Sequence, residues 1–129
     1  MVIKQCDIAD VEQGRELYKF CVAGVTSGLS IVPLFITPIY SATKAGLHSF
    51  SVSLRKQLVN TSIKVFEIIP PIVDTDLDRG ARDKRGQTDK GIKPAQVAKE
   101  AVEAIAKDKF EISIGIVKVL RKGSRIFPK

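Results

Sequence analysis

The stretch Thr26–Lys44 reads TSGLSIVPLFITPIYSATK, and the interpretation of the whole sequence depends on it. A tyrosine and a lysine four residues apart, here Tyr40 and Lys44, lie on one face of a helix, one turn from each other. A lysine ammonium beside a phenol favours the phenolate, which makes the tyrosine a usable acid or base. If the hydroxyl of Ser27 reaches the same pocket, it can hold a carbonyl oxygen. The stretch then predicts an active site for proton transfer.

The spacing of Tyr40 and Lys44 is weak evidence when it stands alone. Most pairs of this kind lie on solvated helix faces, where each contributes about 0.2–0.5 kcal/mol to the helix. Independent signals elsewhere in the chain are needed to favour a site over such a surface pair.

Length and composition predict one folded domain, residues 1–129. Of these 129 residues, 44% are hydrophobic and 27% are charged, as in ordinary globular domains. The net charge of +7 permits an anionic partner. However, the cations of residues 79–93 are interleaved with aspartates, and no known nucleic-acid-binding module accompanies them, so we expect no nucleic-acid partner. The net basic tail, residues 118–129, leaves a contact with a membrane surface as an alternative.

Cysteine and histidine are scarce in this sequence. Cys6 and Cys21, without a recognisable signal peptide, favour reduced thiols in a cytoplasmic protein. No further ligands stand at metal-binding spacing, so we expect no metal site, and we interpret the lone histidine, His48, as a packing residue. Residues 20–43 carry no charge, but prolines and glycines interrupt them, so we expect no transmembrane segment.

Apolar patterns and turn residues predict strands that alternate with helices. The expected strands are Val2–Cys6, Val22–Gly28, Ile63–Ile69 and Glu111–Val117, and the expected helices are residues 11–21, 40–60 and 95–107, the last opened by Pro94. This alternation predicts an α/β fold with a parallel sheet and helices packed over it.

The helix that begins at Tyr40 has two contrasting faces in the sequence. An apolar stripe is formed by Leu47, Phe50, Leu54 and Leu58. A face of small residues, which would allow close packing, is formed by Ala42, Ala45, Gly46, Ser49 and Ser53.

Three motifs in the same order resemble the short-chain dehydrogenase/reductase family. The first is TSG around Ser27, and the second is YSATK, whose Tyr40 follows thirteen residues later. The third is PPIVDT, residues 70–75, directly after an expected strand. The resemblance covers about residues 22–129. It implies a partial doubly wound, Rossmann-like α/β fold, with a mostly parallel sheet flanked by helices.

The resemblance also implies a function, that of an NAD(P)-dependent oxidoreductase acting on a small-molecule carbonyl or secondary alcohol. Ser27 would bind the substrate oxygen, and Tyr40 would exchange the proton and also contact the cofactor. Lys44 would assist the tyrosine and bind the nicotinamide ribose. Residues 78–93 match the loop that covers the substrate. Contacts to the nicotinamide are implied for Pro70, Val73 and Thr75, and contacts to adenine for Asp7 and Ile8.

One expected part of the family pattern is missing from this sequence. A Gly-rich loop, Thr-Gly-x-x-x-Gly-x-Gly, does not occur, and its glycines are what allow backbone to approach a pyrophosphate. The interval between Asp7 and Ser27 is also too short for the elements that the family places there. We therefore expect a truncated, internally deleted domain that binds NAD or NADP weakly. The strand that ends at Ser27 would have an open edge, which favours a homo-oligomer. The alternative is an inactive remnant that associates with itself or with a full-length relative.

Overall fold

The computed structural model describes residues 21–77, 79–84, 86 and 91–126. The expected strand Val2–Cys6, the helix up to residue 20, and the predicted adenine contacts Asp7 and Ile8 lie outside these residues.

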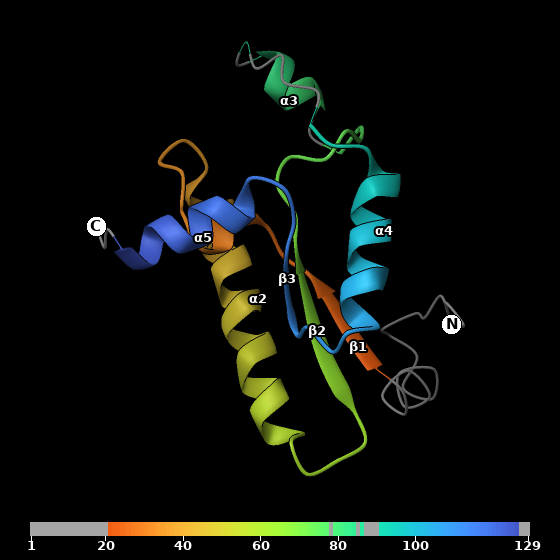
Figure 1. Ribbon diagram of the computed structural model, residues 1–129. Helices are drawn as coiled ribbons and strands as arrows, with labels where there is room; N and C mark the ends of the chain where they lie inside the picture. The colour runs from red at the N-terminus through yellow and green to blue at the C-terminus, as the bar shows by residue number, and fades with distance from the viewer. Residues whose placement is uncertain (1–20, 78, 85, 87–90, 127–129) are drawn as a thin grey trace, which may run out of the picture.

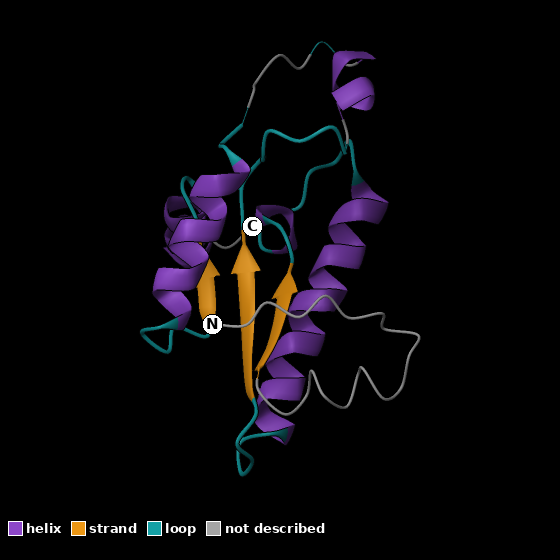
Figure 2. Cartoon of the chain, turned by 90° about the vertical axis from the view of Figure 1, so that its right-hand side faces the viewer, coloured by secondary structure: helices purple, strands orange, loops and turns teal. Residues whose placement is uncertain are grey.

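The described residues form a parallel sheet of three strands, β1 (Cys21–Val25), β2 (Lys64–Ile69) and β3 (Glu111–Ser113). Their order is β1-β2-β3, and both pairs are parallel, with Val22 opposite Val65 and Ile68 opposite Ile112. The three arrows point the same way in Figure 2. The predicted α/β fold with a parallel sheet is confirmed.

Two long helices cover opposite faces of this sheet (Figure 1). Helix α2 (Pro38–Gln57) packs on the face to which Glu67 points, because His48 of α2 contacts that carboxylate. Helix α4 (Pro94–Ile105) packs on the other face, where it covers Phe66. Successive side chains of a strand alternate between faces, so a single strand, β2, supplies both layers.

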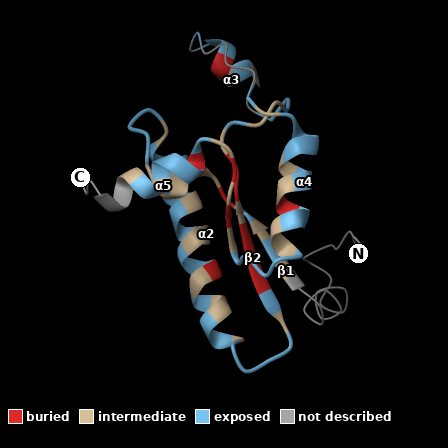
Figure 3. Ribbon diagram, viewed as in Figure 1, coloured by how far each residue is buried: buried red, intermediate tan, exposed pale blue. Residues whose placement is uncertain are grey.

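The hydrophobic core lies between the sheet and α4. Phe66, Ile112 and Ile114 form its centre, and residues of α4 pack against them. The Phe66 ring stacks on Phe110 with the ring centroids 5.4 Å apart. Figure 3 shows that the buried residues concentrate on β2. Burial of one such large side chain contributes about 1.5–3 kcal/mol, so this cluster is the main stabilising element.

Helix α2 differs from its predicted boundaries and faces. It begins at Pro38, where proline suits the first helical turn, and ends at Gln57 rather than near Asn60. The predicted packing faces are wrong in part: Phe50 is 58% exposed, and the five small residues of the expected packing face are exposed or nearly so. Ser41 and Ser51 are the buried residues of α2. The fully buried side chains of the helix are therefore polar, which an apolar periodicity does not reveal, whereas Leu47, Leu54 and Leu58 of the predicted stripe are half-buried.

Three further expectations about the carboxyl-terminal half are corrected. Strand β3 ends at Ser113 instead of Val117, because Gly115 turns the chain with a φ of +56°. The basic tail begins with helix α5 (Val117–Ile126), and the expected loop at residues 78–93 contains the short helix α3 (Arg79–Lys84).

The remaining boundaries differ by at most three residues, the largest difference being the end of β1 at Val25 instead of Gly28. Strand β1 includes Cys21, β2 begins at Lys64, and α4 begins at Pro94. Val102 of α4 is exposed. Among the described helices, none is both long and apolar enough to cross a membrane.

Candidate active site

The predicted site residues lie where β1 and β2 end. Thr26 and Ser27 follow β1, and Pro70 follows β2. Two backbone hydrogen bonds continue the pairing beyond the strands: the Thr26 N–H donates to the Ile68 carbonyl at 2.9 Å, and the Gly28 N–H donates to the Pro70 carbonyl at 3.0 Å. The TSG and PPIVDT motifs therefore meet at the carboxyl edge of the parallel sheet, where open α/β folds bind ligands.

Ser27 is held in a defined orientation. It is the N-cap of the 3-10 helix η1 (Gly28–Ser30), and its Oγ accepts a hydrogen bond from the Leu29 N–H at 3.2 Å. The Ser27 carbonyl accepts a second bond from the Ser30 hydroxyl at 2.7 Å. Because the Ser27 hydroxyl accepts in its capping contact, its hydrogen is available for donation to a ligand oxygen.

Gly28 allows this turn to pack closely against α5. A Cβ at this position would lie 2.9 Å from Cγ2 of Val117, a distance that real Cβ atoms do not adopt. Val117 is itself fully buried. The glycine of the TSG motif is therefore required by packing against Val117.

Tyr40 and Lys44 share one face of α2, as their spacing predicts. The Lys44 Nζ lies 5.6 Å from the centroid of the Tyr40 ring, within the range of a cation–π contact. The same ammonium donates a hydrogen bond to the Val25 carbonyl at 3.3 Å. Tyr40 is 43% exposed, so its ring remains accessible to a ligand. Lys44 thus connects the tyrosine to the strand end that carries Ser27.

The segment after Pro70 is fixed by a short parallel bridge between Val73 and Ile92. The Asp74 N–H donates to the Ile92 carbonyl at 2.8 Å, and the Ile92 N–H donates to the Ile72 carbonyl at 3.0 Å. The Thr75 N–H bonds to the Val73 carbonyl at 2.9 Å, and Thr75 is exposed. The hydrogen bond between Thr75 and Val73 thus joins two residues of the PPIVDT motif, whereas the Pro70 carbonyl accepts a bond from Gly28 of the TSG motif.

Sequence reasoning missed a buried polar cluster beside the site. Glu67 is fully buried, and its carboxylate contacts the Thr26 hydroxyl at 2.7 Å and Nδ1 of His48 at 2.8 Å. His48 was interpreted as a packing residue, and the structure instead gives it an acidic partner. A usable signal was present, because a glutamate in the middle of the apolar run VFEII must find partners when it is buried.

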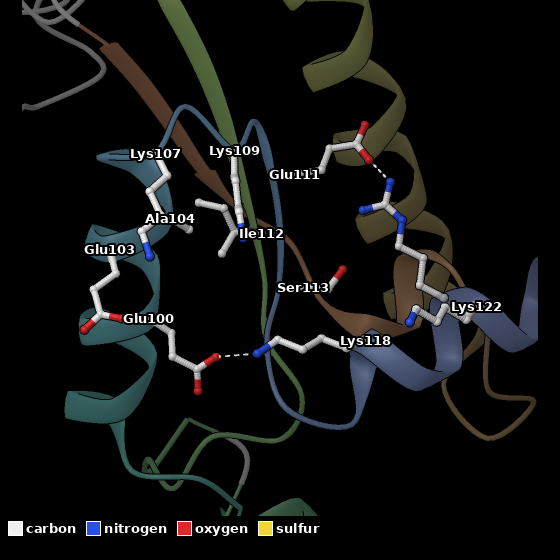
Figure 4. A pocket seen from close by; sticks show the side chains of 11 residues that line it. Glu100, Glu103, Ala104, Lys107, Lys109, Glu111, Ile112, Ser113, Lys118 and Lys122 are labelled. Carbon is white, nitrogen blue, oxygen red and sulfur yellow. Dashed lines mark hydrogen bonds and ion pairs between the residues drawn. The ribbon is translucent and has the colours of Figure 1, made fainter.

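An open groove of about 480 Å³ lies elsewhere, between α4, β3 and α5 (Figure 4). Charged side chains dominate it, and the Lys118 Nζ spans it to reach Glu100 Oε2 at 2.9 Å. Hydrogen bonds from Lys118 and then from Gln96 lower the pKa of Glu100. None of the predicted site residues lines this groove. Within the part of the chain that the structure describes, no three His, Cys, Asp or Glu residues are grouped as for a metal ion.

The sequence model of the short chain dehydrogenase family matches residues 21–86, half of the chain, and these residues contain all three motifs. This chain belongs to the short-chain dehydrogenase family. Its short-chain dehydrogenase relatives include the uncharacterised oxidoreductase DltE of Bacillus subtilis, with 44% identity over 104 residues, or 81% of this chain and 41% of the relative. An uncharacterised oxidoreductase of Staphylococcus saprophyticus is 38% identical over 71 residues, or 52% of this chain and 27% of the relative.

Solved structures of short-chain dehydrogenases share the fold. One from Burkholderia cenocepacia, in complex with NADP, superposes with a TM-score of 0.72 at 20% identity, over 81% of this chain and 42% of that one. A putative short-chain dehydrogenase from Novosphingobium aromaticivorans gives a TM-score of 0.63 at 19% identity, over 92% of this chain and 43% of that one. The chain therefore spans less than half the length of these short-chain dehydrogenases and of the curated relatives.

Proposed function

We propose that this chain is an NAD(P)-dependent oxidoreductase that acts on a small-molecule carbonyl or secondary alcohol. In carbonyl reduction, the Ser27 hydroxyl would donate a hydrogen bond to the substrate oxygen. The Tyr40 phenol would give its proton to the same oxygen, and the Lys44 ammonium would stabilise the phenolate that remains. In alcohol oxidation the proton would move in the opposite direction. The two cysteines support our placing this reaction in the reducing cytoplasm.

The position of Lys44 is the observation that carries this proposal. Its ammonium lies over the Tyr40 ring and also bonds to the Val25 carbonyl, two residues before Ser27. An exposed helix pair, the alternative explanation of this spacing, does not require the lysine to reach the end of a strand.

The chain provides only part of a dinucleotide site. Lys44, Pro70, Val73 and Thr75 would hold the nicotinamide end, because all four stand at or after the carboxyl edge of the sheet. When bound, the nicotinamide supplies or accepts the hydride. This sequence contains no Gly-rich loop to bind the pyrophosphate, so we expect weak affinity for NAD or NADP. Asp7 and Ile8 remain predicted adenine contacts.

Replacement of the tyrosine tests the proposed proton transfer. Tyr40→Phe removes the acidic proton but keeps the ring beneath Lys44, so NADPH-dependent reduction of a small ketone should fall by at least about a hundredfold. Cofactor binding should change little. A matched control is Phe50→Leu, at an exposed ring of the same helix. Equal turnover in Tyr40→Phe and the wild type would rule out this role for Tyr40.

A second candidate function is association without catalysis. Strand β1 stands at an edge of the described sheet, and in the chain that follows it Phe35 is 90% exposed and Ile39 79% exposed. An open strand edge and exposed apolar side chains favour pairing with a second copy or with a full-length relative. Sedimentation velocity separates the two functions: a monomer at high concentration that turns over a secondary alcohol counts against association.

A further inference from the structure

A buried carboxylate lies beside the strand end that carries Ser27. Glu67, in the middle of β2, is 0% exposed. The Thr26 hydroxyl donates to its Oε1 at 2.7 Å, and Nδ1 of His48 lies 2.8 Å from its Oε2. A buried carboxylate without partners is strongly unfavourable, so these two contacts account for its presence in the sheet.

The chemistry of the carboxylate fixes where the protons lie. When Glu67 is ionised, its carboxylate only accepts hydrogen bonds, so both Thr26 and His48 then donate. The Nδ1 of His48 therefore carries a hydrogen, and in a neutral imidazole Nε2 is then the acceptor. The contact thus selects one tautomer of His48, a property that spectroscopy can read.

The cluster connects the two elements on which the predicted catalytic residues stand. Lys44 and His48 are one turn apart on α2. Lys44 reaches the Val25 carbonyl at 3.3 Å, and His48 reaches the next residue, Thr26, through Glu67. Two successive turns of the helix are therefore linked to two successive residues at the end of β1.

The helix continues to follow the strand one turn further. A Cβ at Gly24 would lie 3.5 Å from Oγ of Ser51, so α2 packs closely on β1 there. The fully buried residues of α2 are Ser41 and Ser51, and apolar burial on this face of the sheet comes from Val65 and Ile69 of β2. Apolar contacts are non-directional, whereas hydrogen bonds define a register.

We propose that Thr26, Glu67 and His48 are positioning residues, which align Ser27, just after β1, with Tyr40 and Lys44 on α2. The catalytic purpose of this alignment rests on the proposed function, whereas the alignment itself can be tested without it. Without the cluster, the helix would shift relative to the strand end, and Tyr40 and Lys44 would lose their alignment with the segment that carries Ser27.

Nuclear magnetic resonance on the full chain tests the alignment without any cofactor. At mildly alkaline pH, ¹⁵N spectra of the lone histidine should show the Nδ1–H tautomer in the wild type, and Glu67→Gln should remove this preference. Thr26→Val keeps the side-chain shape but loses the donor, so the ring signals of Tyr40 and the Cε signals of Lys44 should move. Thr26→Ser should restore them. Unchanged signals in Thr26→Val, or an Nε2–H tautomer in the wild type, would overturn the proposal.

A second pair of variants covers the case in which Thr26→Val does not fold. His48 is partly exposed, so substitutions there are better tolerated. His48→Asn places an amide N–H near the position of Nδ1–H and should keep the wild-type signals of Tyr40 and Lys44. His48→Leu lacks the donor and should shift them. Identical spectra for the two His48 variants would overturn the proposal.

NADPH-dependent turnover separates this proposal from the proposed function. We expect turnover to fall about tenfold in Thr26→Val and to stay within about twofold of the wild type in Thr26→Ser. A wild-type chain with the Nδ1–H tautomer and the Thr26→Val shifts, but without NADPH binding, supports the alignment and overturns the proposed function. Wild-type turnover that persists undiminished in Thr26→Val overturns the positioning role and leaves the function standing.

Discussion

At the scale of single residues, the strand ends are held by a few close contacts. Gly28 places its backbone against Pro70 and leaves no room for a Cβ beside Val117. Lys44, and Tyr40 beside it, are linked to the same strand end, because the Lys44 ammonium donates a hydrogen bond to the carbonyl of Val25, the last residue of β1. A single added methyl group at Gly28 therefore affects both packing and the candidate site.

We predict that Gly28→Ala destabilises the protein by about 1–3 kcal/mol, since the buried Val117 side chain cannot move away freely. Gly46→Ala is the matched control. No atom lies within 4 Å of a Cβ there, and alanine suits a helix interior, so stability should rise by about 0.5–1 kcal/mol. Urea denaturation measures both changes. Equal stabilities of the two variants would contradict this account of Gly28.

Sequence alone indicated Ser27, Tyr40 and Lys44 because each belongs to a motif of fixed spacing. It did not indicate how Glu67 pairs with Thr26 and His48, since that contact depends on the register of α2 across the sheet. The prediction that the small residues of α2 form its packing face failed for a related reason. Periodicity in the sequence reports apolar faces, whereas α2 contacts the β1 side of the sheet through Ser51, Lys44 and His48.

At the scale of elements, α4 and α5 are joined by a salt bridge. Glu100 of α4 accepts from the Lys118 Nζ of α5 at 2.9 Å, and this bond is the main cause of the lowered pKa of Glu100. Helix α5 was expected as a basic tail. The structure shows that Val117 is buried, and that Lys118 and Arg121 form salt bridges with glutamates. The run of cations in the sequence does not indicate either feature.

The lowered pKa of Glu100 predicts a pH dependence of stability. Because the folded pKa lies below the unfolded value, near 4.5, the bridge stabilises the protein fully above that pH. The contribution is lost as the pH falls through the folded pKa. Lys118 is largely exposed, so Glu100→Gln should cost only about 0.2–1 kcal/mol at neutral pH, and nothing in strong acid.

Glu103→Gln is the control for this effect, because it removes the same charge from an exposed position of the same helix. Thermal unfolding over a pH series compares the two variants. A loss in Glu100→Gln that grew toward acid pH would contradict the assigned bridge.

At the scale of the whole molecule, one apolar cluster supports the sheet. The alternation of strands and helices predicted the parallel arrangement, and Phe66, Ile112 and Ile114 join β2 and β3 to α4. The boundary at Ser113 and the helix α3 could not be predicted, because they follow from turns at particular positions rather than from any apolar period.

We predict that Phe66→Ala costs about 3–5 kcal/mol, because the residue is buried and stacked on Phe110. This is a large part of the about 5–15 kcal/mol that stabilises a small domain, so much of the protein should unfold. Phe50→Ala, at an exposed ring, should change the free energy of unfolding by less than about 1 kcal/mol. Circular dichroism during urea unfolding checks both, and a stable Phe66→Ala variant would argue against a single core.

If Lys44 belongs to a nicotinamide site, this chain binds NADH or NADPH, and a fluorescence titration with both nucleotides tests this most directly. We expect saturable binding, with a dissociation constant on the order of a millimolar because the pyrophosphate lacks its glycine loop. Binding should be lost in Lys44→Met and kept in Lys56→Met, which removes an exposed lysine from the same helix. No saturation by either nucleotide in the wild type, or equal binding by the two variants, would contradict the claim.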